Sequence, residues 1–293
     1  MTKSIRTDLA LERLDAAKKS HGLGRGVDGV TYRRRTISGL AVHTMDVHTD
    51  EAAHILCKPC GSYYTISLKK LLKRCDDSFI DGTQCIAEVL RSLLPQGNRY
   101  LIACLGNPQI TPDAIGPLCA RQIMVTRHLK AYMPDTFADF SEVSLVCPGV
   151  LGTTGIESAS LVKGAVQAVS PDAVIVVDAL AASDMDRLCC TIQICNTGIE
   201  PGSGVGNRRY ALNHDTLGVP VISIGMPTIV DVSTLLNNIE DFEASNKEKE
   251  NQMMVTPREI DSLVSDSAKL IAYGINFALH DGLTLEDVDL FIS

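Results

Sequence analysis

The chain has 293 residues, 45% of them hydrophobic, and its 27 basic and 35 acidic residues give a formal net charge of -8. This length and apolar content provide for a large buried core, so we expect a globular protein. The net negative charge repels phosphate backbones and anionic lipid, and therefore neither nucleic acid nor a membrane is an expected partner.

Two features of the chain bear on its location. No apolar run approaches the roughly 20 residues of a membrane span, and the opening residues, MTKSIRTDLALER, lack the apolar stretch of a signal peptide. We therefore expect a cytoplasmic protein, in which thiols stay reduced.

The ten cysteines are spread along the chain, several of them in apolar runs. We interpret them as free thiols, with Cys104 and Cys147 buried in strands. The CxxC formed by Cys57 and Cys60 has no second pair at zinc-ribbon spacing, so we interpret it as incidental and predict neither metal nor cofactor.

The first third of the chain mixes several patterns. Residues 1 to about 20 indicate an arm or helix, and the glycine-rich residues 22–29 indicate a connector. Residues 30–47 favour strands, whereas residues 68–77 and 83–94 favour helices. We interpret residues 22–80 as a β-containing subregion of a single α/β domain spanning residues 1–293.

From residue 99 onward, apolar strands alternate with helices. The predicted strands are 99–106, 142–149, 173–180, 189–195 and 219–225, and the predicted helices include 113–133 and 155–169. Such alternation is typical of an α/β fold, here a doubly wound, mostly parallel sheet with helices on both faces.

The chain closes with a predicted helix over residues 254–279. Thr256 and Glu259 have the spacing of a capping box, with Pro257 in the first helical position. One helix face is apolar and is expected to pack on the sheet; it comprises Ile260, Leu263, Val264, Ala268, Ile271, Ile275 and Ala278.

Two aspartates follow apolar strands. Asp178 ends the run AVIVVD, and Asp113 follows Thr111, which can cap a helix, and Pro112, which suits a first helical turn. Because ligands of such sheets bind beyond the carboxyl ends of the strands, we expect both carboxylates at one rim.

The surroundings of the two acids are expected to separate their pKa values. A helix N-terminus favours the ionised form of Asp113, and an apolar strand favours the protonated form of Asp178. Such a pair can activate water and donate a proton, which is peptide-hydrolysis chemistry without a metal. Each acid alone is also explained by an ordinary structural role, a helix-dipole contact or a turn cap.

The loop GIEPGSGVGNRR carries part of a dinucleotide-binding spacing at Gly202 and Gly204. No apolar helical pattern follows it, so we interpret it as a loop that covers a cleft. Arg208 and Arg209 could hold an acidic substrate group there, although solvated surface arginines explain them as well.

Several long segments resemble the germination protease family of spore-forming bacteria. They include RTDLALE, LGNPQITPDAIGP, CPGVLGTTGIES, PDAVIVVDALAAS and TIQICNTGIEPGSGVGNRR, in this order along the chain. The resemblance implies an aspartic-type endopeptidase that degrades small acid-soluble spore proteins in the forespore or spore core. It also implies a fold similar to the hydrogenase-maturation proteases, a homotetramer, and Asp113 and Asp178 as the catalytic pair.

The segment from Thr7 to Glu12, TDLALE, is similar to the sequence that the family cuts in its substrates. The resemblance therefore implies a zymogen that removes residues 1–8 by cleaving between Asp8 and Leu9, whereas the residues alone favour an ordinary capped helix. Because the residue before the cut is acidic, we hypothesise a basic contact from Arg208 or Arg209.

Two other functions stay open. The first is a metal-dependent maturation-type endopeptidase of the same fold, with Asp113 and other acids as ligands. The second is a non-catalytic protein that holds a peptide in the cleft.

Overall fold

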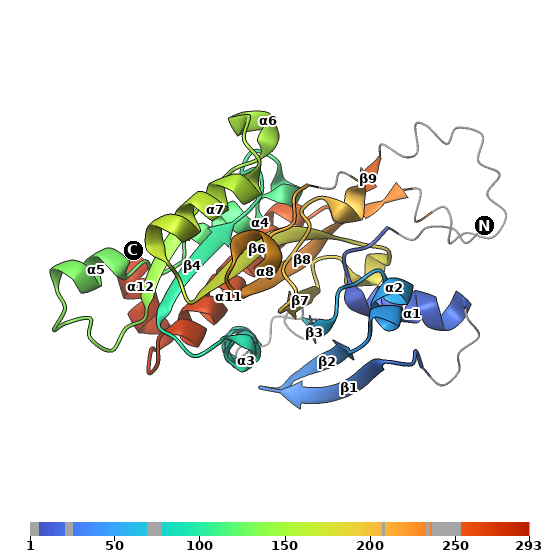
Figure 1. Ribbon diagram of the computed structural model, residues 1–293, viewed down its shortest axis with the longest axis horizontal. Helices are drawn as coiled ribbons and strands as arrows, with labels where there is room; N and C mark the ends of the chain where they lie inside the picture. Colours follow the sequence, from blue (N-terminus) through green and yellow to red (C-terminus); the bar gives the residue numbers. More distant parts are fainter. Residues whose placement is uncertain are drawn as a thin grey trace.

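The computed structural model describes residues 6–20, 26–68, 78–206, 209–232, 235 and 253–292. Within these residues the strands form one sheet of nine (Figure 1). Its members are β1 (Val30–Ile37), β2 (Leu40–Val47), β3 (Gly61–Ser67), β4 (Arg99–Cys104), β5 (Glu142–Val146), β6 (Ala173–Ala182), β7 (Thr191–Cys195), β8 (Val221–Asp231) and β9 (Met254–Val255).

The sheet combines a parallel and an antiparallel part. Its order is β1-β2-β3-β7-β8-β6-β4-β5, with β9 paired to β8. Strands β8, β6, β4 and β5 pair in parallel, as the apolar runs predict, whereas β1, β2, β3 and β7 pair antiparallel and β7 joins them to β8. The α/β class is therefore confirmed, but the sheet is mixed rather than mostly parallel.

The antiparallel part begins with a hairpin. Ser38 and Gly39 connect β1 to β2 with positive φ angles of 43° and 75°, the backbone of a tight hairpin turn. The predicted β-containing subregion of residues 22–80 holds β1, β2 and β3, which extend the same sheet instead of forming a separate one.

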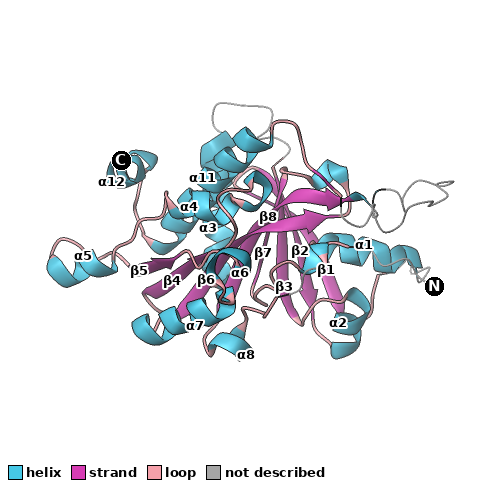
Figure 2. Ribbon diagram, turned by 90° about the horizontal axis from the view of Figure 1, so that it is seen from above, coloured by secondary structure: helices cyan, strands magenta, loops and turns pink. Residues whose placement is uncertain are grey.

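Helices cover both faces of the sheet (Figure 2). Helices α3 (Ser78–Leu93), α4 (Ile115–Ala120) and α11 (Ile260–Leu279) pack on one face, against the side of β4 that carries Ile102. Helix α7 (Ser158–Val169) packs on the other, against Leu101 and Ala103. The alternation of β4 side chains between the two cores is that of a strand buried on both faces.

Shorter elements complete the chain. Helices α1 (Ala10–Ser20) and α2 (Asp50–Leu56) lie beside β1 and β2. The others are α5 (Arg127–Tyr132), α6 (Leu151–Thr154), α8 (His214–Leu217), α12 (Leu285–Ile292) and the 3-10 turns η2 (Thr111–Asp113), η3 (Met185–Arg187) and η4 (Ser203–Val205). None of the helices formed by the described residues combines the length and apolar character needed to cross a membrane.

The single helix predicted over residues 113–133 is wrong, because the chain there forms η2, α4 and α5. Tertiary hydrogen bonds replace helical ones at the break. The N–H of Met124 donates to Asn276 Oδ1 at 3.0 Å, and Thr126 Oγ1 accepts from the N–H of Val143 at 3.0 Å. Thr111 lies inside η2 and provides no cap.

The capping box predicted for the last helix is also wrong. Helix α11 begins at Ile260 with no side-chain cap, and Thr256 Oγ1 instead donates to the carbonyl of Thr228 at 2.9 Å. The predicted apolar face does pack into the core.

Other sequence predictions differ in detail. Cys104 is buried and free, but Cys147 is exposed and free, because β5 lies at the edge of the sheet and ends before it. The helix predicted over residues 68–77 lies, from residue 69 onward, outside the described residues, as do residues 22–25 of the predicted connector.

Candidate active site

Asp178 lies within β6 rather than at its end. The strand continues to Ala182 because β8 pairs with it throughout, and Asp178 stands opposite Gly225. Only 5% of Asp178 is exposed, and its Oδ1 accepts a hydrogen bond of 2.9 Å from the N–H of Ala179. A carboxyl group in this environment is poorly solvated and therefore resists ionisation.

Asp113 is the last residue of the turn η2, which follows β4 in the chain. Its Oδ2 and its carbonyl oxygen both accept from the N–H of Asn107, at 2.9 and 3.0 Å. Gly106 makes this approach possible: its φ is 116°, and a Cβ there would lie 2.0 Å from the Asp113 carbonyl oxygen. The sequence GNPQITPD thus folds back to fix the Asp113 carboxylate.

Both aspartates line one cavity of about 550 Å³, together with Asp8, Leu180 and Gly202. Burial, followed by the charge of Asp113, raises the pKa of Asp178 well above its usual value. Burial also raises the pKa of Asp113, opposed by the hydrogen bond from Asn107. The predicted bias of Asp113 toward its ionised form is therefore wrong in direction, because burial raises its pKa.

Asp178 is more deeply buried than Asp113, so the neutral, protonated form is favoured more strongly at Asp178. A protonated Asp178 has no net charge, and Asp113 can then ionise beside it without like-charge repulsion. Two carboxyl groups in these states can supply an acid and a base to one cavity.

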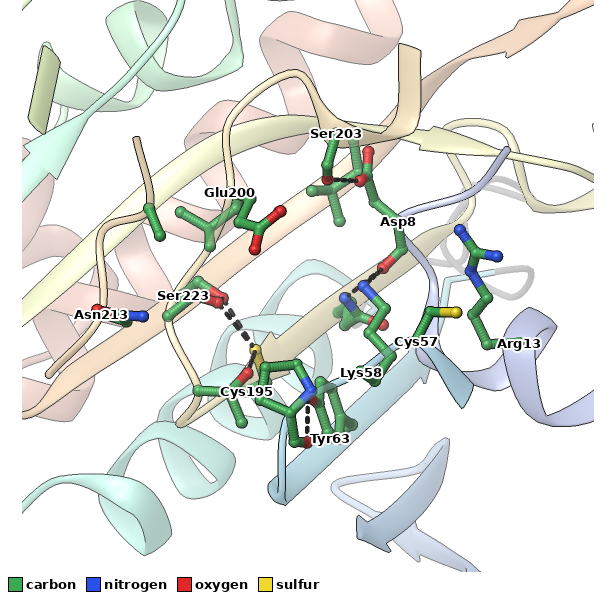
Figure 3. A pocket seen from close by; sticks show the side chains of 18 of the residues that line it. Asp8, Arg13, Cys57, Lys58, Tyr63, Cys195, Glu200, Ser203, Asn213 and Ser223 are labelled. Atoms are coloured by element: carbon green, nitrogen blue, oxygen red, sulfur yellow. Dashed lines mark hydrogen bonds between the residues drawn. The ribbon is translucent and has the colours of Figure 1, made fainter. Parts of the chain in front are cut away.

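The N-terminal segment reaches this cavity through Asp8. The N–H of Asp8 donates to the carbonyl of Ala181 at 2.9 Å, three residues beyond Asp178. The Asp8 carboxylate accepts from the N–H of Ala181 at 2.9 Å and from Ser203 Oγ at 2.6 Å (Figure 3). Asp8 also contributes its charge to the raised pKa of Asp178.

The chain was compared with known proteins. The family model described as germination protease matches residues 8–252. Germination proteases of Clostridium perfringens and Caldanaerobacter subterraneus are 38% and 39% identical to it, covering 99% and 97% of both sequences. The chain belongs to the germination protease family. It is a protease, so the predicted family and the enzyme class, a peptide-bond hydrolase, are confirmed.

Two further comparisons extend the picture. The germination protease of Bacillus velezensis is 34% identical over 97% of this chain and 95% of its own. Among solved structures, a [NiFe] hydrogenase maturation protease HycI from Thermococcus kodakarensis aligns with a TM-score of 0.37 and 20% identity, over 64% of this chain and 98% of its own.

The residues of the segment TDLALE that follow Asp8 are also bound by the rest of the protein. Leu9 and Ala10 are fully buried, and Leu9 packs against Leu180 and Val230. Glu12 is 6% exposed, and its carboxylate accepts from the N–H and Oγ of Ser183, both at 2.7 Å. Arg187 pairs with the same carboxylate at 3.5 Å.

The glycine-rich loop contacts Asp8 through residues near its glycines. Gly202 and Gly206 have positive φ angles of 73° and 75° and frame the turn that carries Ser203. A Cβ on Gly204 would lie 2.2 Å from Asp8 Oδ2. The absence of a side chain at residue 204 therefore leaves room for the Asp8 carboxylate.

The sequence predicted that Arg208 or Arg209 of this loop contacts the acidic residue, and the structure describes only one of the two arginines. Arg209 lines the cavity and pairs with Glu157 at 3.8 Å. Arg208 lies outside the described residues. The polar contacts to the Asp8 carboxylate come instead from Ser203 and Ala181.

Four residues of the site escaped the sequence analysis: Lys58, Gln193, Ser203 and Ala181. All of them donate a hydrogen bond to Asp8, from four separate places in the chain, and Figure 3 labels Lys58 and Ser203 among them. Lys58 lies between Cys57 and Pro59 in the CxxC stretch, where only the cysteines suggested chemistry. No spacing pattern connects it to Asp8, which is 50 residues away.

Proposed function

We propose that this protein is an aspartic-type endopeptidase made as a zymogen, which uses Asp113 and Asp178 to cut its own chain between Asp8 and Leu9. The observation that supports this most strongly is that Asp8 lines the same cavity as both aspartates. Its contacts with Ala181 hold the segment along β6, beside the acid pair.

The proposed chemistry follows from the unequal pKa values of the pair. Ionised Asp113 takes a proton from a water molecule, whose oxygen bonds to the carbonyl carbon of Asp8. The bond between this carbon and Leu9 N then breaks, and Asp178 gives its proton to the departing nitrogen. The products are a carboxyl group on Asp8 and an amino group on Leu9.

We further propose that small acid-soluble spore proteins are cut in the same way, in the forespore or spore core during germination. The name of the relatives supports a role in germination, and the bound TDLALE segment supports an acidic residue before the cut. In this proposal Ser203 and the Ala181 N–H bind the acidic side chain before the cut, and the absence of a side chain at Gly204 leaves room for it.

Incubation of the purified protein tests the zymogen directly. At mildly acidic to neutral pH, N-terminal sequencing is expected to find a new terminus at Leu9. The processed protein is then given a peptide of residues 1–16, with an Asp8→Asn peptide as its matched control. We expect the aspartate peptide to be cut at least about tenfold faster, because the charged group makes the stronger hydrogen bonds.

Variants separate the candidates for acid recognition. Ser203→Ala is expected to reduce the preference for aspartate over asparagine. Arg209→Ala tests the arginine hypothesis made from the sequence, which a reduced preference in that variant would support. A protein that binds the peptide for hours and leaves it intact contradicts the proposed function and supports a non-catalytic role.

A further inference from the structure

The carbonyl oxygen of Asp8 has two side-chain donors. Lys58 Nζ donates to it at 2.7 Å and Gln193 Nε2 at 3.1 Å (Figure 3 shows the lysine). This oxygen belongs to the peptide bond that the proposed function cuts. Neither donor lines the cavity that holds Asp113 and Asp178, and both line a second cavity of about 520 Å³. Asp8 lines both cavities, so this residue lies between the acid pair and the two donors.

Gln193 contacts the backbone on both sides of the bond between Asp8 and Leu9. While its Nε2 donates to the Asp8 carbonyl, its Oε1 accepts from the N–H of Ala10 at 2.6 Å. The residue is 6% exposed and sits in β7, between β3 and β8. A side chain fixed in a central strand can hold a peptide group with little loss of entropy on binding.

Lys58 is positioned by a rigid turn. Cys57 ends α2 in the left-handed conformation, with φ 51°, and the N–H of Lys58 donates to the carbonyl of Ala53 at 3.1 Å. The next residue, Pro59, accepts at its carbonyl from the buried Tyr63 hydroxyl at 2.7 Å. These contacts direct the lysine from α2 across to the N-terminal segment.

Polar and charged side chains surround the Lys58 amine. As a whole residue Lys58 keeps some solvent contact, but protein surrounds its amine, and this burial lowers its pKa while the Asp8 carboxylate opposes the shift. Arg13 and Glu200 also act on the amine, with opposite signs. In such surroundings a hydrogen bond to developing negative charge is much stronger than in water.

We propose that Lys58 and Gln193 form the oxyanion site of the peptidase. Attack of water on the carbonyl carbon moves an electron pair onto the carbonyl oxygen, and the two donors stabilise the negative charge there until the C–N bond breaks and the pair returns. Lys58 keeps its proton throughout. The inference rests on the proposed function, since it requires hydrolysis between Asp8 and Leu9.

The alternative is that Lys58 and Gln193 only hold the N-terminal segment in place, as a clamp. Cleavage kinetics on a separate peptide substrate distinguish this role from an oxyanion site. Lys58→Met, Lys58→Arg and Gln193→Glu are first processed by a small amount of tagged wild-type protein, which is then removed. Lys163→Met, on the exposed face of α7, is the control. The substrate is the peptide of residues 1–16.

Lys58→Met and Gln193→Glu are expected to lower kcat about 100- to 1000-fold with little change in KM, because the charge on the oxygen develops only in the transition state. Lys58→Arg is expected to restore part of the rate. Gln193→Glu keeps the shape of the side chain, so a lower kcat in this variant is separable from misfolding.

Two results contradict the inference in different ways. If wild-type protein cuts the peptide and both variants match Lys163→Met in kcat, Lys58 and Gln193 are a clamp and the oxyanion site is wrong, while the proposed function stands. If wild-type protein leaves the peptide intact, the proposed function is wrong and the oxyanion site with it.

Discussion

Asp178 has a carboxyl group in the interior of the protein, and its surroundings favour the neutral form. Burial and the nearby charges of Asp113 and Asp8 raise its pKa, and one backbone hydrogen bond opposes them. A raised pKa means that the folded protein binds a proton which the unfolded chain has already released. At any pH above the pKa that Asp178 has in the unfolded chain, the residue therefore lowers the free energy of unfolding.

Replacement of Asp178 by asparagine is expected to stabilise the protein at neutral pH. Asparagine keeps an oxygen for the Ala179 N–H but carries no charge to bury. Thermal unfolding across pH measures this: the melting temperature of Asp178→Asn should exceed that of wild type near pH 7. The difference should shrink as the pH falls toward the ordinary aspartate pKa of about 4. Equal melting temperatures at every pH would contradict the burial of an ionisable group.

Gly204 gives a second prediction for a single residue. A Cβ there would lie 2.2 Å from Asp8 Oδ2 and 2.7 Å from Ala181 Cβ, so Gly204→Ala must displace Asp8. Self-cleavage is expected to slow about tenfold or more, since the cleaved bond moves out of position. The control is Gly164→Ala in α7, where a Cβ meets nothing within 4 Å. Gly164→Ala should cleave like wild type and gain about 0.5–1 kcal/mol of stability. Wild-type cleavage by Gly204→Ala would contradict the proposed position of Asp8.

Among the elements, strands were easier to predict than helices. The runs that become β4, β6 and β8 are apolar because both faces of these strands are buried, and a short sequence window contains that information. The break between α4 and α5 depends on a residue of α11 far along the chain, Asn276. Local pattern cannot contain such a contact, so the prediction of one continuous helix was wrong.

Asn276 is accordingly expected to matter for stability. It is 1% exposed, accepts from the Met124 N–H at 3.0 Å and donates to the Gln122 carbonyl at 2.8 Å. Asn276→Ala leaves both backbone groups without this partner and is expected to cost about 2–4 kcal/mol in urea unfolding. Ser265→Ala, on the exposed face of α11, is the matched control and should change stability by less than about 0.5 kcal/mol. Similar effects of both variants would show that the contact does not fix the break.

Over the whole molecule, the sequence allowed prediction of the fold class and of the position of Asp113 and Asp178 at one cavity, but not of the other residues that line it. Asp113 follows β4, and Asp178 lies in the neighbouring parallel strand β6, one residue beyond the partner of the last β4 residue. The pairing of these two strands therefore brings both aspartates to the carboxyl end of β4. Lys58 reaches Asp8 from the turn between α2 and β3, and Gln193 reaches it from β7. No local pattern encodes the attachment of the antiparallel strands through β3 and β7. The homotetramer implied by the resemblance stays a prediction, which light scattering in solution tests.

Treatment with a chelator distinguishes the acid pair from a metal centre. The described part of the chain brings together no group of three or more histidine, cysteine, aspartate or glutamate side chains suited to a metal ion. We expect protein treated with a strong chelator and then dialysed to form the Leu9 terminus at the rate of untreated protein. A lost rate that an added divalent metal restores would favour the metal-dependent alternative.

The most direct test of the account is the rate at which the Leu9 terminus forms in wild type, Asp113→Asn and Asp178→Asn, with Asp266→Asn on the exposed face of α11 as control. Either substitution at the acid pair is expected to slow self-cleavage about 1000-fold or more, while circular dichroism shows a folded protein and Asp266→Asn behaves as wild type. A folded Asp113→Asn or Asp178→Asn protein that forms the Leu9 terminus at the wild-type rate would contradict it.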